Sequence, residues 1–122
     1  MASSGTIYVV DDDLAVRESL SMLLTLSGYQ VQTFESAPRF LSDAKPARGD
    51  CLIADIRMPD MDGLTLQQEM KRRGAAVPII IITGHGDVPL AVQAMEAGAV
   101  DFIEKPFARD VILAAVRRAL AA

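Results

Sequence analysis

Five short runs typical of strands, most of them continuously apolar and one alternating, are separated by amphipathic segments and constrain the fold of this chain more than any other feature of its sequence. The runs cover residues 7–10, 31–34, 51–54, 79–82 and 100–103. Between and after them, apolar residues recur three and four positions apart, as on one face of a helix, within residues 16–24, 37–44, 64–73, 88–95 and 112–120. Strands that alternate with helices are joined by right-handed crossovers and form a parallel sheet with helices on both faces. We therefore predict an α/β fold, (βα)5, with a doubly wound five-stranded parallel sheet.

Polar and glycine residues mark the expected ends of these helices. Asp13 and Asp87 directly precede the first and fourth helical segments, where a carboxylate can accept hydrogen bonds from the first free amides. Gly28 and Gly98 follow the same two segments and are expected to end them.

The composition indicates one soluble domain of a reducing compartment. A chain of 122 residues suits a single core, and one cysteine, Cys51, excludes an internal disulfide. No apolar run approaches the roughly 20 residues that span a bilayer, and the first residues lack the pattern of a signal peptide. The net charge of −4 argues against nucleic acid as a direct partner of this segment. We expect a cytoplasmic domain that binds neither membrane nor nucleic acid.

Polar residues that could carry chemistry follow four of the predicted strands. These residues are Asp11 and Asp12, Asp55, Thr83 and Lys105. The carboxyl ends of parallel strands share one edge of the sheet, so the five side chains should gather there. Three carboxylates in one crevice repel each other unless a cation is present. Oxygen ligands of this kind suit Mg²⁺, or Mn²⁺ in its place.

Within such a cluster Asp55 is the natural nucleophile. A carboxylate can attack an activated phosphoryl group and form an acyl phosphate, while a metal offsets the charge on the phosphoryl oxygens. Lys105 would supply a movable positive charge, and Thr83 a hydroxyl hydrogen bond. Each residue taken alone has an ordinary explanation as a helix cap, loop residue or solvated charge. The prediction depends on their recurrence at successive strand ends.

Four motifs bring the chain close to a known family. They are VVDDD at 9–13, DIRMPDMDG at 55–63, TGHGD at 83–87 and DFIEKPF at 101–107. Together they resemble the response-regulator receiver domains of two-component signalling, whose fold is called flavodoxin-like or CheY-like. The stretch from Thr83 to Phe107 more particularly resembles the FixJ-type subgroup. By this resemblance residues 1–122 form one receiver domain.

The resemblance also implies roles for individual residues. Asp55 would be the phosphoacceptor, and Mg²⁺ would be held by Asp11, Asp12, Asp55 and the backbone carbonyl of Arg57. Lys105 would contact the phosphoryl group and precede a cis bond to Pro106. Thr83 and Phe102 match the pair of switch residues. The positions of Arg57 and His85 suggest that they set the lifetime of the acyl phosphate.

The implied partners are a sensor histidine kinase, which would donate the phosphoryl group, and a second copy of the chain. Phosphorylation would shift a conformational equilibrium, reshape the surface of the fourth helix and fifth strand, and promote a homodimer. FixJ-type regulators continue into a DNA-binding output domain that controls transcription, and this chain ends before one. The domain would be regulatory, catalysing only its own phosphorylation and dephosphorylation.

Three alternatives compete with this interpretation. The chain could be a degenerate or stand-alone receiver that works by protein contact. An aspartyl-phosphate phosphatase also uses a strand-end Asp with Mg²⁺, but carries a second Asp where this chain has Arg57. A flavodoxin-like carrier needs a hydroxyl- and glycine-rich phosphate loop after the first strand, where residues 11–13 are acids that would repel the phosphate.

Overall fold

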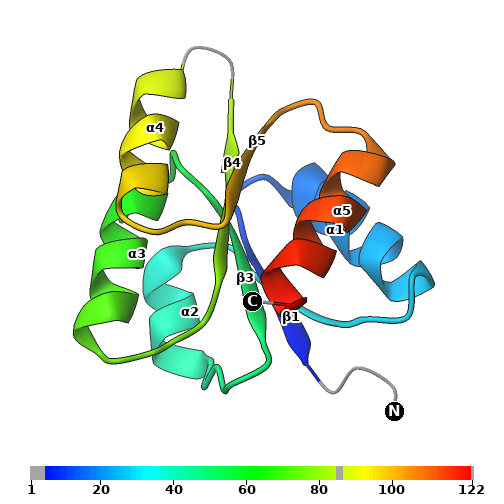
Figure 1. Cartoon of the computed structure of the whole chain (residues 1–122), viewed down its shortest axis with the longest axis horizontal. Helices are drawn as coiled ribbons and strands as arrows, with labels where there is room; N and C mark the ends of the chain where they lie inside the picture. Colours follow the sequence, from blue (N-terminus) through cyan, green and yellow to red (C-terminus); the bar gives the residue numbers. More distant parts are fainter. Residues whose placement is uncertain (1–4, 85–86, 122) are drawn as a thin grey trace.

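The described residues form a parallel sheet covered by helices on both faces, as predicted. The structure is a computed structural model that describes residues 5–84 and 87–121. In chain order its elements are β1 (Thr6–Val10), α1 (Leu14–Leu26), β2 (Gln30–Phe34), α2 (Ala37–Asp43), β3 (Cys51–Asp55), α3 (Gly63–Arg72), β4 (Ile79–Thr83), α4 (Val88–Glu96), β5 (Asp101–Glu104) and α5 (Arg109–Ala121). The strand order is β2-β1-β3-β4-β5, and each strand pairs in parallel with its neighbours. Figure 1 shows α2, α3 and α4 on one side of the sheet and α1 and α5 on the other.

The side chains of the continuous apolar runs pack against helices on both faces of the sheet. Ile79 and Ile81 of β4 pack with residues of α2, α3 and α4, whereas Ile80 and Ile82 pack with residues of α1 and α5. Every residue of β3 and β4 is buried. Because consecutive strand side chains point to opposite faces, a strand covered on both sides needs apolar residues at nearly every position. Cys51 is one of them, and burial raises the pKa of its thiol to about 12.

The predicted cap of α1 is confirmed, whereas Asp87 takes the N-cap position of α4 without a side-chain capping bond. Asp13 accepts a hydrogen bond from the amide of Ala15 at 2.9 Å. Asp87 occupies the corresponding position before α4, but its side chain makes no capping bond within the described part of the chain. Pro89, the second residue of α4, has no N–H to offer. The carboxylate of Asp87 instead binds Arg57.

The topology decides where a ligand can approach the sheet. The chain passes from β1 outward to β2 and returns across β1 to β3, so the strand order reverses between β1 and β3. In open parallel sheets, crevices form outside the carboxyl ends of the strands at such a reversal. Asp11 follows one of these two strands and Asp55 ends the other. The fold therefore places these acids beside the crevice.

Candidate functional site

Three carboxylates meet at this edge of the sheet. Carboxylate oxygens of Asp11, Asp12 and Asp55 lie within 4.8 Å of one another. Asp11 is fully buried and Asp55 nearly so, whereas Asp12 is exposed to solvent. The cluster thus has a buried floor and an open side from which a ligand can enter.

Lys105 reaches this cluster from the end of β5. Its ammonium Nζ donates a hydrogen bond to Asp55 Oδ2 at 2.9 Å and lies 3.0 Å from Asp11 Oδ2. Burial lowers the pKa of Lys105, but the two carboxylates outweigh burial and raise the pKa above its ordinary value. The side chain is therefore positively charged at neutral pH. The bond from Lys105 to Pro106 is cis, which confirms that expectation.

Asp11 has the least favourable surroundings for a negative charge. Burial raises its pKa, the neighbouring charge of Asp55 raises it further, and the amide of Asp13 and the ammonium of Lys105 oppose these effects. Asp11 Oδ1 accepts the amide of Asp13 at 2.9 Å. Its Oδ2 is close to Lys105 but has no hydrogen-bond partner among the described residues. Within the described residues the ion pair with Lys105 is thus what offsets the charge of this oxygen, and a metal cation beside it would offset the charge further.

The donor set fits a hard divalent cation. Converging carboxylates with one unbonded, buried oxygen are the ligands that Mg²⁺ prefers, and an open side leaves room for its waters. Asp11, Asp12 and Asp55 would hold the ion. Arg57 lies next to them, since its amide donates to Asp55 Oδ1 at 3.1 Å. The role of its carbonyl as a further ligand stays a prediction.

The two expected switch residues lie on neighbouring strands. Thr83 ends β4, is buried, and donates its hydroxyl to the carbonyl of Gly84 at 3.1 Å. Phe102 of β5 is partly buried and packs against the cluster beneath α2, α3 and α4. The hydroxyl of Thr83 is thus bonded away from the carboxylates. His85, the other predicted site residue, lies outside the described residues.

Two arginines contribute contacts that we did not predict. The guanidinium of Arg57 pairs with Asp87 at 2.6 Å, and this hydrogen bond raises the pKa of Arg57. Arg17 of α1 donates Nη1 to the backbone carbonyl of Asp11 at 2.7 Å, which fixes the chain where the acids begin. Arg57 and Asp87 are 30 positions apart, and Arg17 reaches back six positions to a backbone carbonyl. Neither separation follows from the periodicity of a helix or a strand, so the sequence pattern did not indicate these contacts.

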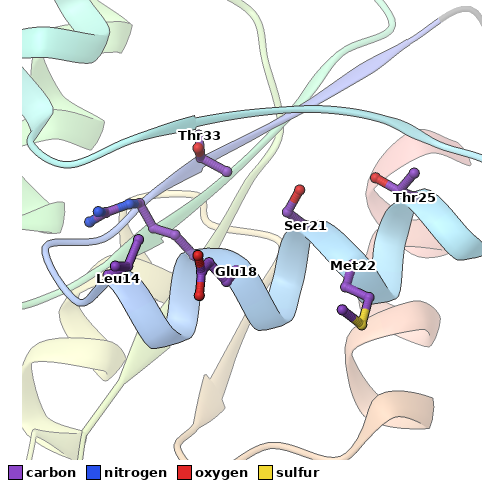
Figure 2. Close-up of a pocket in the computed structure, with 7 residues that line it drawn as sticks. Leu14, Glu18, Ser21, Met22, Thr25 and Thr33 are labelled. Atoms are coloured by element: carbon purple, nitrogen blue, oxygen red, sulfur yellow. The ribbon is translucent and has the colours of Figure 1, made fainter.

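A groove lined by polar and apolar side chains runs along α1 from this site. Figure 2 shows its lining by one face of α1 and by Thr33 of β2. The groove has a volume of about 720 Å³. Leu14 at its near end is 58% exposed and Met22 further along is 67% exposed. Leu14 follows Asp12 by two residues, so the groove begins beside the acidic cluster.

Among the residues that the structure describes, no helix has the length and apolar character needed to cross a bilayer.

The chain matches the response regulator receiver domain family over residues 7–117.

Among curated relatives, the response regulator protein TodT of Pseudomonas putida is 50% identical over 117 residues, which are 96% of this chain and 52% of the relative. The transcriptional regulatory protein FixJ of Bradyrhizobium diazoefficiens is 50% identical over 121 residues, covering 98% of this chain and 58% of the relative. The chain therefore spans about half the length of these relatives. The crystal structure of FixJ-N superimposes with a TM-score of 0.90 at 48% identity, covering 97% of this chain and 94% of FixJ-N.

Proposed function

This chain belongs to the response regulator receiver domain family, and we propose that it is a switch in which Asp55 accepts a phosphoryl group from a sensor histidine kinase. Receiver domains of this family are regulatory proteins and not classical enzymes. The observation that carries the proposal is the setting of Asp55. It is a nearly buried carboxylate at a strand end, bonded to Lys105 and next to two further acids.

The contacts of Asp55 suit a nucleophile. Its Oδ1 is held by the amide of Arg57 and its Oδ2 by Lys105, so the carboxylate has a defined orientation. One of its oxygens would bond to phosphorus while the bond from phosphorus to the nitrogen of the kinase histidine breaks. Lys105 would remain within reach of the transferred oxygens. A bound Mg²⁺ or Mn²⁺ would neutralise part of their charge.

The output that we propose is a change of protein contacts at α4 and β5. Thr83 would exchange its bond to Gly84 for one to a phosphoryl oxygen, and Phe102, which is only partly buried, would turn inward. Val88 and Val92 of α4 are 40% and 45% exposed beside the edge strand β5, which supports an apolar contact between two copies there. Transcriptional output from a DNA-binding domain outside residues 1–122, and a cytoplasmic location, belong to the same proposal.

The kinase would dock along the groove of α1. A donor histidine must come close to Asp55, and the groove begins beside the acidic cluster with exposed apolar side chains (Figure 2). Met22 lies away from the carboxylates. Met22→Glu places a charge in the groove, so it should slow phosphorylation by the kinase and leave phosphorylation by acetyl phosphate unchanged. Equal rates with the kinase would refute this docking surface.

Intact-protein mass spectrometry after incubation with acetyl phosphate or phosphoramidate tests the function directly. We expect one added phosphoryl group that requires Mg²⁺, is absent in Asp55→Asn and persists in Asp60→Asn, an exposed acid of the same loop. No adduct in the wild type would leave a degenerate receiver that acts by protein contact.

The coupling of Thr83 to dimerisation and the lifetime of the acyl phosphate need separate measurements. Thr83→Ala should still gain the phosphoryl group but should not dimerise in sedimentation experiments, and a phosphorylated Thr83→Ala dimer would contradict the proposed coupling. Arg57→Ala and His85→Ala should alter the dephosphorylation rate. Unchanged rates in both variants would dispose of their role in the lifetime.

A further inference from the structure

Helix α4 is tied to the rest of the domain at both of its ends. At its N-terminus, Asp87 Oδ1 pairs with Arg57 Nε at 2.6 Å. Toward its C-terminus, Gln67 donates to the carbonyl of Ala94 at 3.1 Å and Lys71 donates to the carbonyl of Ala97 at 2.8 Å. Figure 1 shows α3 and α4 on the same side of the sheet.

The N-terminal tie differs from the others because it involves the loop of the phosphoacceptor. Arg57 follows Asp55 by two residues, and its amide is bonded to the Asp55 carboxylate. Asp87 follows Thr83 by four residues and directly precedes α4. The ion pair therefore joins the loop after β3 to the loop after β4 across the site.

Because Asp87 pairs with Arg57, its side chain does not cap α4. Asp13, Ser36 and Asp62 each accept an amide hydrogen bond of the helix that they precede. Asp87 has the same position, and its side chain is of the same type as those of Asp13 and Asp62, but its carboxylate faces Arg57. The amide of Leu90, which a freed Asp87 could cap, now bonds to the backbone carbonyl of Asp87 at 3.1 Å.

We propose that the Arg57–Asp87 ion pair is a latch that holds the N-terminus of α4 in the unphosphorylated arrangement, and that a phosphoryl group on Asp55 opens it by competing for Arg57. This inference rests on the proposed function. It adds an element, the side-chain pair between residues 57 and 87, to the switch residues Thr83 and Phe102.

The charges favour this exchange. Phosphorylation would replace the single negative charge of the Asp55 carboxylate by a group of about −1.5 to −2 charges with three acceptor oxygens, next to the Arg57 backbone. A guanidinium binds phosphoryl oxygens in a two-pronged geometry that the contact through Nε to Asp87 does not use. The Arg57 side chain is 68% exposed and therefore free to turn. Asp87 would then be available to cap α4, while Gln67 and Lys71 keep the other end in place.

The test measures how tightly the whole chain binds beryllofluoride, a stable analogue of the phosphoryl group, in the presence of Mg²⁺. Asp87→Asn breaks the ion pair but keeps a side chain that caps helices as well as aspartate does. We expect the apparent affinity to rise about two- to fivefold, the range for a partly exposed ion pair. In an Arg57→Gln background the same substitution should change nothing, because the latch is already open.

Nuclear magnetic resonance of the Leu90 and Ala91 amides gives a second readout. In the metal-free Asp87→Asn protein both signals should move toward their positions in the beryllofluoride complex of the wild type. The matched control is Asp43→Asn, which loses the same charge and a comparable pair with Arg39 at 2.7 Å far from the site, and should bind as the wild type does.

Three results would overturn the latch: unchanged affinity in Asp87→Asn, an equal gain in the Arg57→Gln background, or an equal gain in Lys71→Met at the opposite end of α4. Wild-type protein that binds beryllofluoride without moving the α4 signals would instead refute the proposed switch, and the latch with it. An α4 response in the wild type with no effect of Asp87→Asn would refute the latch alone.

Discussion

Gly63 lies directly behind the phosphoacceptor, and a single added methyl group there tests how closely the site depends on packing. A β-carbon at Gly63 would stand 2.6 Å from the carbonyl oxygen of Asp55, 3.0 Å from the α-carbon of Ile56 and 3.1 Å from the carbonyl carbon of Asp55. All three are backbone atoms, so no side chain can turn away. The amide of Gly63 is also bonded to the carbonyl of Ile56 at 3.0 Å, which holds the two segments together.

The contact distance gives the size of the effect. A carbon–oxygen contact in proteins is ordinarily at least about 3.3 Å, so Gly63→Ala requires a backbone shift of roughly 0.7 Å. Forcing an extra carbon into a packed site costs about 1–3 kcal/mol, or roughly 4–12 °C of the melting temperature of a chain of this size. A displacement approaching 1 Å at a reacting group can slow its reaction by up to about a hundredfold. We expect phosphorylation of Gly63→Ala to be roughly 10- to 100-fold slower.

The assay combines calorimetry with the rate of phosphorylation by acetyl phosphate at saturating Mg²⁺, measured well below both melting temperatures. Ile112→Val is the matched control. Ile112 is fully buried on the opposite face of the sheet, and this substitution costs about 1 kcal/mol without touching Asp55. The control should melt earlier but react at the wild-type rate.

Two outcomes would refute the reasoning. A Gly63→Ala protein with the stability and rate of the wild type would show that the loop relaxes without cost. A protein that melts earlier but reacts at the wild-type rate would show that Asp55 stays in place and that the strain is absorbed by α3.

Further predictions concern the charges of the domain. Lys105→Met should lower the free energy of unfolding at pH 7 by about 1–2 kcal/mol, because two neighbouring carboxylates lose their counter-ion; the figure is reduced because the Lys105 side chain is 24% exposed. Urea titrations should show that this loss of stability shrinks at lower pH, and equal stability of variant and wild type would contradict the prediction. Mg²⁺ at about 100 times its dissociation constant should stabilise the wild type by about 2.7 kcal/mol but Asp12→Asn far less, and thermal melts that rise equally in both would exclude Asp12 as a ligand. Hydrogen bonds from two arginines lower the pKa of Glu69 from 4.5 to about 2, so its contribution is present above pH 4.5 and is lost toward pH 2. Glu69→Gln should therefore melt earlier than the wild type at neutral pH and match it near pH 2, and a pH-independent difference would contradict this. Cys51, with a thiol pKa of about 12, should resist iodoacetamide at pH 8 until urea unfolds the chain; labelling of the folded protein would show that the strand opens.

The element order and the position of the acids could be predicted because each depends on a rule that acts locally or through topology. The run Ile79–Thr83 is recognisable as a buried strand from its side chains alone. Once strands and helices alternate, handedness brings the carboxyl ends of the strands to one edge. The sequence therefore predicts that Asp11, Asp12 and Asp55 lie together, and their carboxylate oxygens lie within 4.8 Å of one another.

The unequal surroundings of these acids could not be read from the chain. Asp11 and Asp12 are adjacent and of the same type, yet one is fully buried and the other exposed. Their burial depends on which elements cover the end of β1, and Arg17 holds that end from α1. The unbonded oxygen of Asp11, which supports a cation site, follows from that packing.

Asp87 marks the limit of sequence reasoning most clearly. Its position before a helix favours a cap, a local rule that succeeds for Asp13 and Asp62. Here a proline removes one amide, and an arginine 30 positions earlier comes within 2.6 Å. By itself the sequence determined the fold and the chemistry of the strand ends, because periodicity and handedness act on every such chain. Only the tertiary structure decided which charges pair, because that depends on distances between segments that the chain does not connect.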